Sequence, residues 1–99
     1  MAIVHLSGNI DRRTVPEARR HLLNELDHGG VALHIDMGEV DWIDSAGLAT
    51  LVEIAQHARH AGLQVHLHRV RAGVMKMVRL AHLEDVFSIC ESVADRTVH

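Results

Sequence analysis

The stretch Trp42-Ile43-Asp44-Ser45-Ala46-Gly47-Leu48 has the pattern of a buried β-segment that passes directly into a helix. An Asp-Ser pair before an apolar helical pattern predicts an N-cap, because either side chain, Asp44 or Ser45, can accept a hydrogen bond from a free amide of the first turn. A helix start carries partial positive charge and unpaired N–H groups, so a phosphate on Ser45 would be electrostatically favourable there. We expect Gly47 to leave the first turn bare, so that another protein could approach the hydroxyl closely.

Taken alone, this stretch supports two interpretations. Most Asp-Ser pairs before a helix are caps with no further role. In the second interpretation Ser45 is a phosphoacceptor, and its phosphorylation would add about −1.5 to −2 charges beside Asp44. That charge would meet an attractive helix dipole and a repulsive carboxylate, so we expect a large change in surface potential and little change in fold.

The segments on both sides alternate between strand and helix patterns, which predicts an α/β fold. After the stretch we expect a helix from Ser45 to Ala61, a strand from Leu63 to His68, a short helix over 74–81, a last strand from Val86 to Cys90 and a helical or frayed tail from Glu91 to His99. The strict alternation of the middle strand implies a sheet with one face in water and helices on the other.

Before the stretch, the pattern predicts a strand from Ala2 to Ser7 and a turn from Gly8 to Asp11. A helix should open at Thr14, whose hydroxyl we expect to cap the first amides. A clear strand follows from Val31 to Asp36, and we expect a polar loop from Gly38 to Asp41 before the deciding stretch.

Composition places limits on the classes of function. The chain has 99 residues, so we expect a single domain over residues 1–99. A net charge of −3 and two aromatic residues, Trp42 and Phe87, give no reason to expect nucleic-acid binding. No apolar run approaches a membrane span and no signal peptide is evident, and Cys90 is the only cysteine. We therefore expect a cytoplasmic protein that does not insert into membranes.

The order of these motifs resembles the STAS family, named for sulfate transporters and anti-sigma factor antagonists. The resemblance runs from about Leu6 to Ile89, most of the chain. Its motifs are Leu6 to Asp11, similar to the family's strand–Gly–x–(Leu/Ile)–Asp turn, Leu33 to Asp36, similar to the strand before the switch loop, and Ile43 to Leu48, similar to the Asp-Ser/Thr-x-Gly-Leu signature. Ala61 to Leu63, Leu80 to Leu83 and Val86 to Ile89 follow in family order.

The resemblance implies a STAS fold, with a mostly parallel or mixed four- to five-stranded sheet and helices mainly on one face. It implies an anti-sigma factor antagonist that works by partner switching. In such circuits the unphosphorylated antagonist binds an anti-sigma factor that is also a serine protein kinase, the kinase phosphorylates the residue matching Ser45, and a phosphatase restores it. The resemblance also implies that Asp11 lies near Ser45, within a partner-binding surface made of Asp11, Asp44, Ala46, Gly47 and Leu48.

A second function is also compatible with the resemblance. Some short STAS proteins are accessory subunits on the ATPase of a lipid-transport ABC complex, and there the same helix start is a docking surface. Family members usually begin with an extra strand before the one expected at Ala2 to Ser7, so we expect an exposed sheet edge that is open to pairing. An enzyme is not expected, with no catalytic residues and no cofactor, because no acid–base or nucleophile set stands out.

Histidines are frequent, ten in all. His57 and His60 lie three apart on a helix, and His66 and His68 share one strand face, so either pair has a spacing that could hold zinc. We expect solvent-facing histidines and no metal site, because no cysteine or carboxylate cluster completes a ligand set. Their titration predicts partner binding that is mildly pH-sensitive below about pH 6.5. Cys90 is expected to be a small buried apolar residue.

Overall fold

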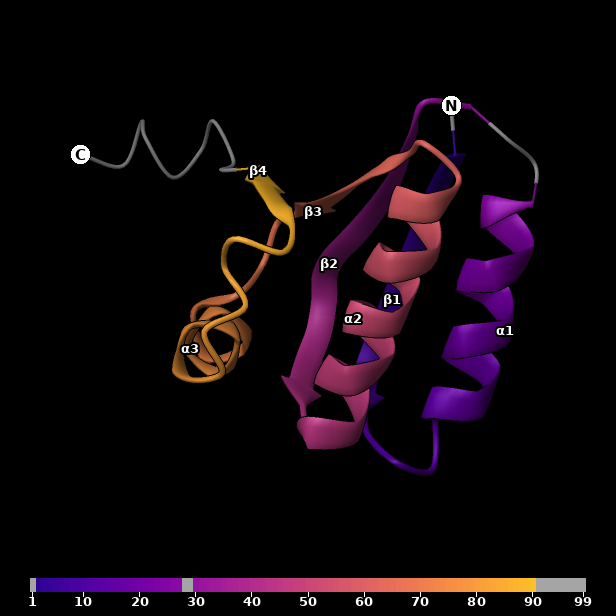
Figure 1. The fold of residues 1–99 in the computed structure, drawn as a ribbon. Coiled ribbons are helices and arrows are strands. Elements are labelled where there is room, and N and C mark those ends of the chain that lie inside the picture. Colours follow the sequence, from indigo (N-terminus) through magenta and orange to yellow (C-terminus); the bar gives the residue numbers. More distant parts are fainter. Residues whose placement is uncertain (1, 28–29, 91–99) are drawn as a thin grey trace.

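A computed structural model of the chain describes residues 2–27 and 30–90 (Figure 1). The tail expected from Glu91 to His99 lies outside these residues. The elements, in chain order, are β1 (Ala2–Ile10), α1 (Val15–Leu26), β2 (Ala32–Ile43), α2 (Ser45–His60), β3 (Gln64–His68), α3 (Ala72–Leu80) and β4 (Ser88–Cys90).

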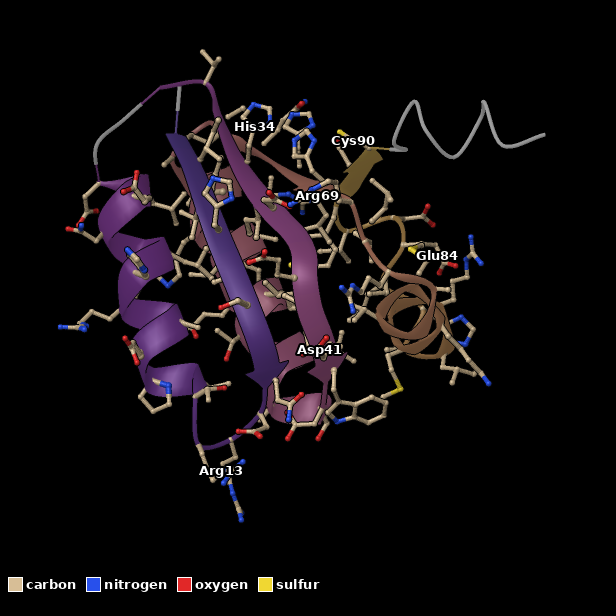
Figure 2. The ribbon with its side chains drawn as sticks, turned by 180° about the vertical axis from the view of Figure 1, so that it is seen from behind. Arg13, His34, Asp41, Arg69, Glu84 and Cys90 are labelled. Carbon is tan, nitrogen blue, oxygen red and sulfur yellow. The ribbon has the colours of Figure 1, made fainter. Side chains whose placement is uncertain are left out.

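The four strands form one sheet in the order β1-β2-β3-β4, and every neighbouring pair is parallel. Each connection between parallel strands passes through a helix, as this topology requires. Figure 1 shows α1 and α2 on one face of the sheet, with α3 to the side, beyond the end of β3. The view from behind, in Figure 2, shows the opposite face of β1 and β2 without a helix over it. The predicted α/β fold, with helices mainly on one face, is confirmed.

The core lies between this sheet and the two helices. It is built from side chains at strand and helix spacing that are at most 1% exposed, among them Leu22, Leu33, Ile35, Ile43, Leu51 and Ile54. Burying each such side chain contributes about 1.5–3 kcal/mol. At the surface, the Arg19 guanidinium of α1 donates to both carboxylate oxygens of Glu53 on α2, at 2.8 and 2.7 Å. The two helices are thereby held together by packing and by a bidentate ion pair.

The strand β2 is much longer than the sequence pattern predicts. Both the predicted strand end at Asp36 and the predicted loop from Gly38 to Asp41 are wrong, since the strand continues to Ile43. The polar residues resemble a loop in sequence, but they pair with β1, as in the register Ser7 to Glu39. Val31, the predicted first residue of this strand, lies just outside it and is 84% exposed.

β1 also extends beyond its predicted end. The predicted turn from Gly8 is wrong, because β1 continues to Ile10. Gly8 has φ +72 and the register with β2 shifts between Gly8 and Asn9, so the glycine forms an irregularity within the strand. The two long strands therefore end together, where Ile10 is paired with Ile43.

The remaining elements agree closely with the pattern. Leu63, Val65 and Leu67 are buried, whereas Gln64 is exposed and the β3 histidines are partly exposed, as the alternation predicts. Within residues 2–27 and 30–90, no helix is both long and apolar enough to cross a membrane.

Candidate functional site

The candidate site lies where β1 and β2 end and where α1 and α2 begin. Figure 1 shows both arrowheads and both helix starts at the same end of the molecule. The Asp44 amide donates to the Ile10 carbonyl at 3.2 Å, which joins the turn after β2 to the end of β1. Asp11 directly follows Ile10. The sheet therefore brings Asp11 and Asp44, the two aspartates predicted in the partner-binding surface, to the same end of the paired strands.

Asp44 is the N-cap of α2. Its backbone is extended, with φ −103 and ψ −174, and its Oδ1 accepts from the Gly47 amide at 2.9 Å. The Asp44 carbonyl accepts from the Leu48 amide at 2.9 Å, which begins the helical pattern of hydrogen bonds. A side-chain cap of this kind contributes about 0.5–2 kcal/mol. Of the two capping candidates in the sequence, Asp44 performs the role and Ser45 does not.

Ser45 is consequently the first residue of α2, and it is exposed. No hydrogen bond joins its hydroxyl to another residue of the described chain, so no general base activates it there. The first turn of α2 contains no acidic residue after the cap. The hydroxyl is therefore open to solvent at the start of the helix.

Gly47 has a different role from the one predicted. It is buried, so the expectation that it leaves the turn bare for a partner is wrong. A Cβ at this position would lie 2.5 Å from the Ile10 carbonyl oxygen and 2.6 Å from Cγ1 of Ile43. The glycine therefore permits α2 to start in direct contact with the ends of both strands. Leu48 is also buried, at 6% exposure.

The neighbouring turn from β1 to α1 is fixed by Asp11 and Thr14. The Asp11 carboxylate accepts from the amides of Arg13 and Thr14, at 2.9 and 3.3 Å, and from the Arg13 guanidinium at 3.4 Å. The Thr14 hydroxyl donates to the Asn9 carbonyl at 2.8 Å and accepts from the Asp11 amide at 3.0 Å. The predicted side-chain cap by Thr14 is wrong, because its hydroxyl turns back toward β1.

The carboxylate of Asp11 is held in its charged form by this turn. Desolvation raises its pKa, but the hydrogen bonds from Arg13 and Thr14 together lower the pKa below its ordinary value. The site therefore carries fixed negative charge beside the helix start. The Arg13 side chain extends away from the body of the protein at the same end (Figure 2).

Two features of this edge could not be located from the sequence. Trp42 was expected in a buried segment, yet it is 47% exposed, while Ile43 is fully buried. Asp41, expected in a loop, is at the end of β2 and pairs with Arg71 at 3.0 Å, while Arg71 Nε donates to the Gly38 carbonyl at 2.9 Å. The buried positions of β2 do not alternate strictly beyond Met37, because the register with β1 shifts twice, so periodicity alone would not have placed both side chains.

The site is a rigid turn that presents an unpartnered hydroxyl at the positive end of a 16-residue helix. Carboxylates lie next to the hydroxyl in sequence and across the paired strand ends. Such a surface can take up a phosphoryl group with little rearrangement, and the added charge would be visible to any protein that contacts it.

Comparison with known proteins agrees with the α/β fold described above. A family model described as the STAS domain matches residues 1–96. An anti-sigma-B factor antagonist of Listeria monocytogenes is 26% identical over 86 residues, which cover 87% of this chain and 75% of that protein.

Solved structures show the same fold. An anti-sigma factor antagonist from Mycobacterium paratuberculosis superposes with a TM-score of 0.77 at 23% identity, covering 97% of this chain and 81% of that one. The anti-sigma factor antagonist SpoIIAA in its unphosphorylated form gives a TM-score of 0.76 at 13% identity, covering 97% and 83%.

Proposed function

The chain belongs to the STAS domain family, and from this we propose that it is an anti-sigma factor antagonist whose partner binding is switched by phosphorylation of Ser45. The proposed partners are an anti-sigma factor that is also a serine protein kinase and a phosphatase that reverses its action. Curated relatives are named as antagonists of this type. The observation that carries the proposal is the exposed, unpartnered Ser45 hydroxyl as the first helical residue after the Asp44 cap.

The geometry supports a serine that serves as substrate for another protein's kinase. Because Asp44 already satisfies the Gly47 amide, Ser45 can be modified without loss of the cap. The first turn has no acidic residue, so a phosphate would be attracted by the helix dipole and would meet repulsion mainly from Asp44. The fold should therefore tolerate the phosphate.

The partner would recognise phosphorylation of Ser45 through the change in surface charge. Of the residues that the family resemblance places at the interface, Ser45 is exposed and Asp11, Asp44 and Ala46 are partly exposed. Gly47 and Leu48 are buried, so we assign them to holding the turn in place. A surface that is fixed by packing changes its potential without changing its shape, which is how a local phosphate can dissociate a partner.

The test is phosphorylation by purified serine-kinase anti-sigma factors of the native host, followed by intact-mass measurement. We expect the wild-type chain to gain one phosphate, Ser45→Ala to gain none, and Ser88→Ala to behave like wild type. Ser88 is the matched control because it is also exposed but lies on β4. Equal phosphorylation of the Ser45→Ala variant would contradict the site, and failure of every host kinase of this class would contradict the function.

The alternative, docking on the ATPase of a lipid-transport ABC complex, predicts a different result. In that case the purified ATPase would bind the chain, and phosphorylation would not be required for release. Either function makes the chain a cytoplasmic regulatory or accessory subunit without catalytic activity of its own. Direct binding assays with both purified candidates decide between the two.

A further inference from the structure

The open face of the sheet carries a cluster of histidines far along the strands from Ser45. His34 of β2 is paired in register with His66 of β3, and His68 lies two residues further on the same face. The His34 and His66 rings stack with their centroids 4.9 Å apart, and the centroids of His34 and His68 are also 4.9 Å apart. Cys90, on the adjoining strand β4, is paired in register with His68. Three neighbouring strands thus contribute four nitrogen and sulfur side chains to one patch.

These side chains form two close pairs. His34 Nδ1 lies 2.7 Å from His68 Nε2, and the Cys90 sulfur lies 3.9 Å from His66 Nδ1. As they stand, no three His, Cys, Asp or Glu side chains within residues 2–27 and 30–90 are arranged to hold a metal ion. The His34 and His68 nitrogens contact each other directly, at a shorter distance than two nitrogens bound to one zinc ion would have.

To form a ligand set the side chains would have to rotate, because the His34 and His66 rings are stacked 16° from parallel and their nitrogens do not yet face a common point. Ligands at zinc distances and tetrahedral angles place two nitrogens about 3.3 Å apart, and a nitrogen and a sulfur about 3.6 Å apart. The observed separations of 2.7 and 3.9 Å differ from these values by about 0.6 Å or less. All four residues are only partly buried, so an ion could reach them from solvent.

We propose that His34, His66 and His68, with Cys90 in the fourth position, form a binding site for a divalent transition metal of the zinc class that is assembled on the open sheet face when the ion arrives. Two histidines at alternate positions of one strand and a third from the neighbouring strand offer imidazoles on a common side of a rigid sheet. The preference for nitrogen and sulfur ligands identifies the ion as zinc-like and excludes magnesium or calcium. The bound ion would join β2, β3 and β4.

The charged groups nearby are occupied elsewhere. The Asp36 carboxylate accepts two bonds from the Arg69 guanidinium, at 2.9 and 2.8 Å, and one from His5 at 3.0 Å. It also accepts from the Gly38 amide at 2.9 Å. Asp36 is therefore not available as a ligand, and Arg69 is held away from the histidines by this carboxylate.

The proposal is tested with the tag-free full chain and cobalt, whose spectrum reports its ligands, followed by displacement with zinc. We expect one equivalent of cobalt to bind with the visible absorption of a tetrahedral site, together with a sulfur-to-cobalt charge-transfer band. His34→Ala or His68→Ala should weaken the affinity by more than about 10-fold, and Cys90→Ser should remove the charge-transfer band and also weaken the affinity, because it removes a ligand. The double variant His57→Ala and His60→Ala, on the exposed face of α2, should bind cobalt as wild type does.

Two results would overturn the proposal. One is a wild-type chain that takes up no cobalt or zinc at micromolar concentrations, and the other is uptake that survives in the His34 and His68 variants. Because a variant could lose the metal through misfolding, a zinc titration of the wild-type chain, followed by NMR, provides an independent test. Zinc should shift the NMR signals of the His34, His66 and His68 rings in one step at one equivalent, and shifts confined to other histidines would also refute the site.

Discussion

The backbone amide of Asp44 donates a 3.2 Å hydrogen bond to the carbonyl of Ile10, so the turn that starts α2 is joined directly to the end of β1. The same Ile10 carbonyl lies 2.5 Å from the place of a Cβ on Gly47. Two strand ends and one helix start therefore meet without room for another atom. The position of Ser45 depends on this contact, and the following predictions test its parts.

Gly47→Ala should destabilise the fold. The added methyl would press on the Ile10 carbonyl oxygen and on Ile43 Cγ1, and backbone cannot yield cheaply, so we expect a loss of about 1–3 kcal/mol in the free energy of unfolding. Urea denaturation measures the effect. Gly73→Ala is the control, because a Cβ there meets nothing within 4 Å and alanine favours a helix. Equal stability of the two variants would show that the contact at Gly47 is not tight.

Asp44→Ala should remove the cap of α2 and cost about 0.5–2 kcal/mol of stability. The reason is the loss of the 2.9 Å bond from the Gly47 amide. Asp44→Asn keeps an oxygen at the same place, so it should retain most of the stability. If the alanine and asparagine variants lose the same amount, the capping bond is not what stabilises the turn.

Ser45→Asp should leave the fold almost unchanged. Negative charge in the first turn of a helix contributes about 0.3–1 kcal/mol, and repulsion from Asp44 offsets part of it. We expect the free energy of unfolding to change by less than about 1 kcal/mol in denaturant titrations. If the variant unfolds, or if its free energy of unfolding falls by several kcal/mol, then a charge at this position disturbs the fold as well as changing the surface potential.

Acid should weaken the fold through Asp36. Hydrogen bonds from Arg69 lower the pKa of this carboxyl to about 2, against the opposing effect of burial, with further help from the Gly38 amide and His5. Because the folded pKa is below the unfolded one, the stabilisation is present above about pH 4 and is lost as the pH falls toward 2. The pKa shift sets an upper limit of about 2 kcal/mol on this stabilisation. The actual contribution is smaller, because solvent screens the largely exposed Arg69 side chain.

The measurement is stability against pH for the wild-type chain and Asp36→Asn, with a chelator present. The difference between the two should shrink as the pH falls from about 4 to 2. Glu39→Gln is the matched control, since Glu39 is an exposed carboxyl on the same strand. A difference between wild type and Asp36→Asn that stays constant over this range would contradict the assignment to Asp36.

Local sequence patterns predicted the elements whose periodicity is complete within one segment. The alternation from Leu63 to His68 and the start of α2 at the Asp44-Ser45 pair were both apparent, because burial and capping repeat at fixed spacings. The family resemblance then supplied the kind of sheet, with helices mainly on one face, and the expectation that the partner-binding surface lies at Ser45.

Features that depend on a partner segment could not be read in this way. The residues from Gly38 to Asp41 resemble a loop until β1 is placed beside them, and Gly8 resembles a turn until the register with β2 is known. Gly47 was predicted to face a partner, but it faces the strand ends. Only its packing on Ile10 shows this direction. The cluster at His34 required the register of β2 against β3.

The central claim is that a partner kinase distinguishes the two states of Ser45. Its most direct test is the affinity of the purified kinase for the chain before and after phosphorylation of Ser45, measured under the same conditions by calorimetry. We expect phosphorylation to weaken binding by more than about 10-fold, which corresponds to about 1.4 kcal/mol. Equal affinity of the two forms, with phosphorylation at Ser45 verified by mass, would contradict the claim.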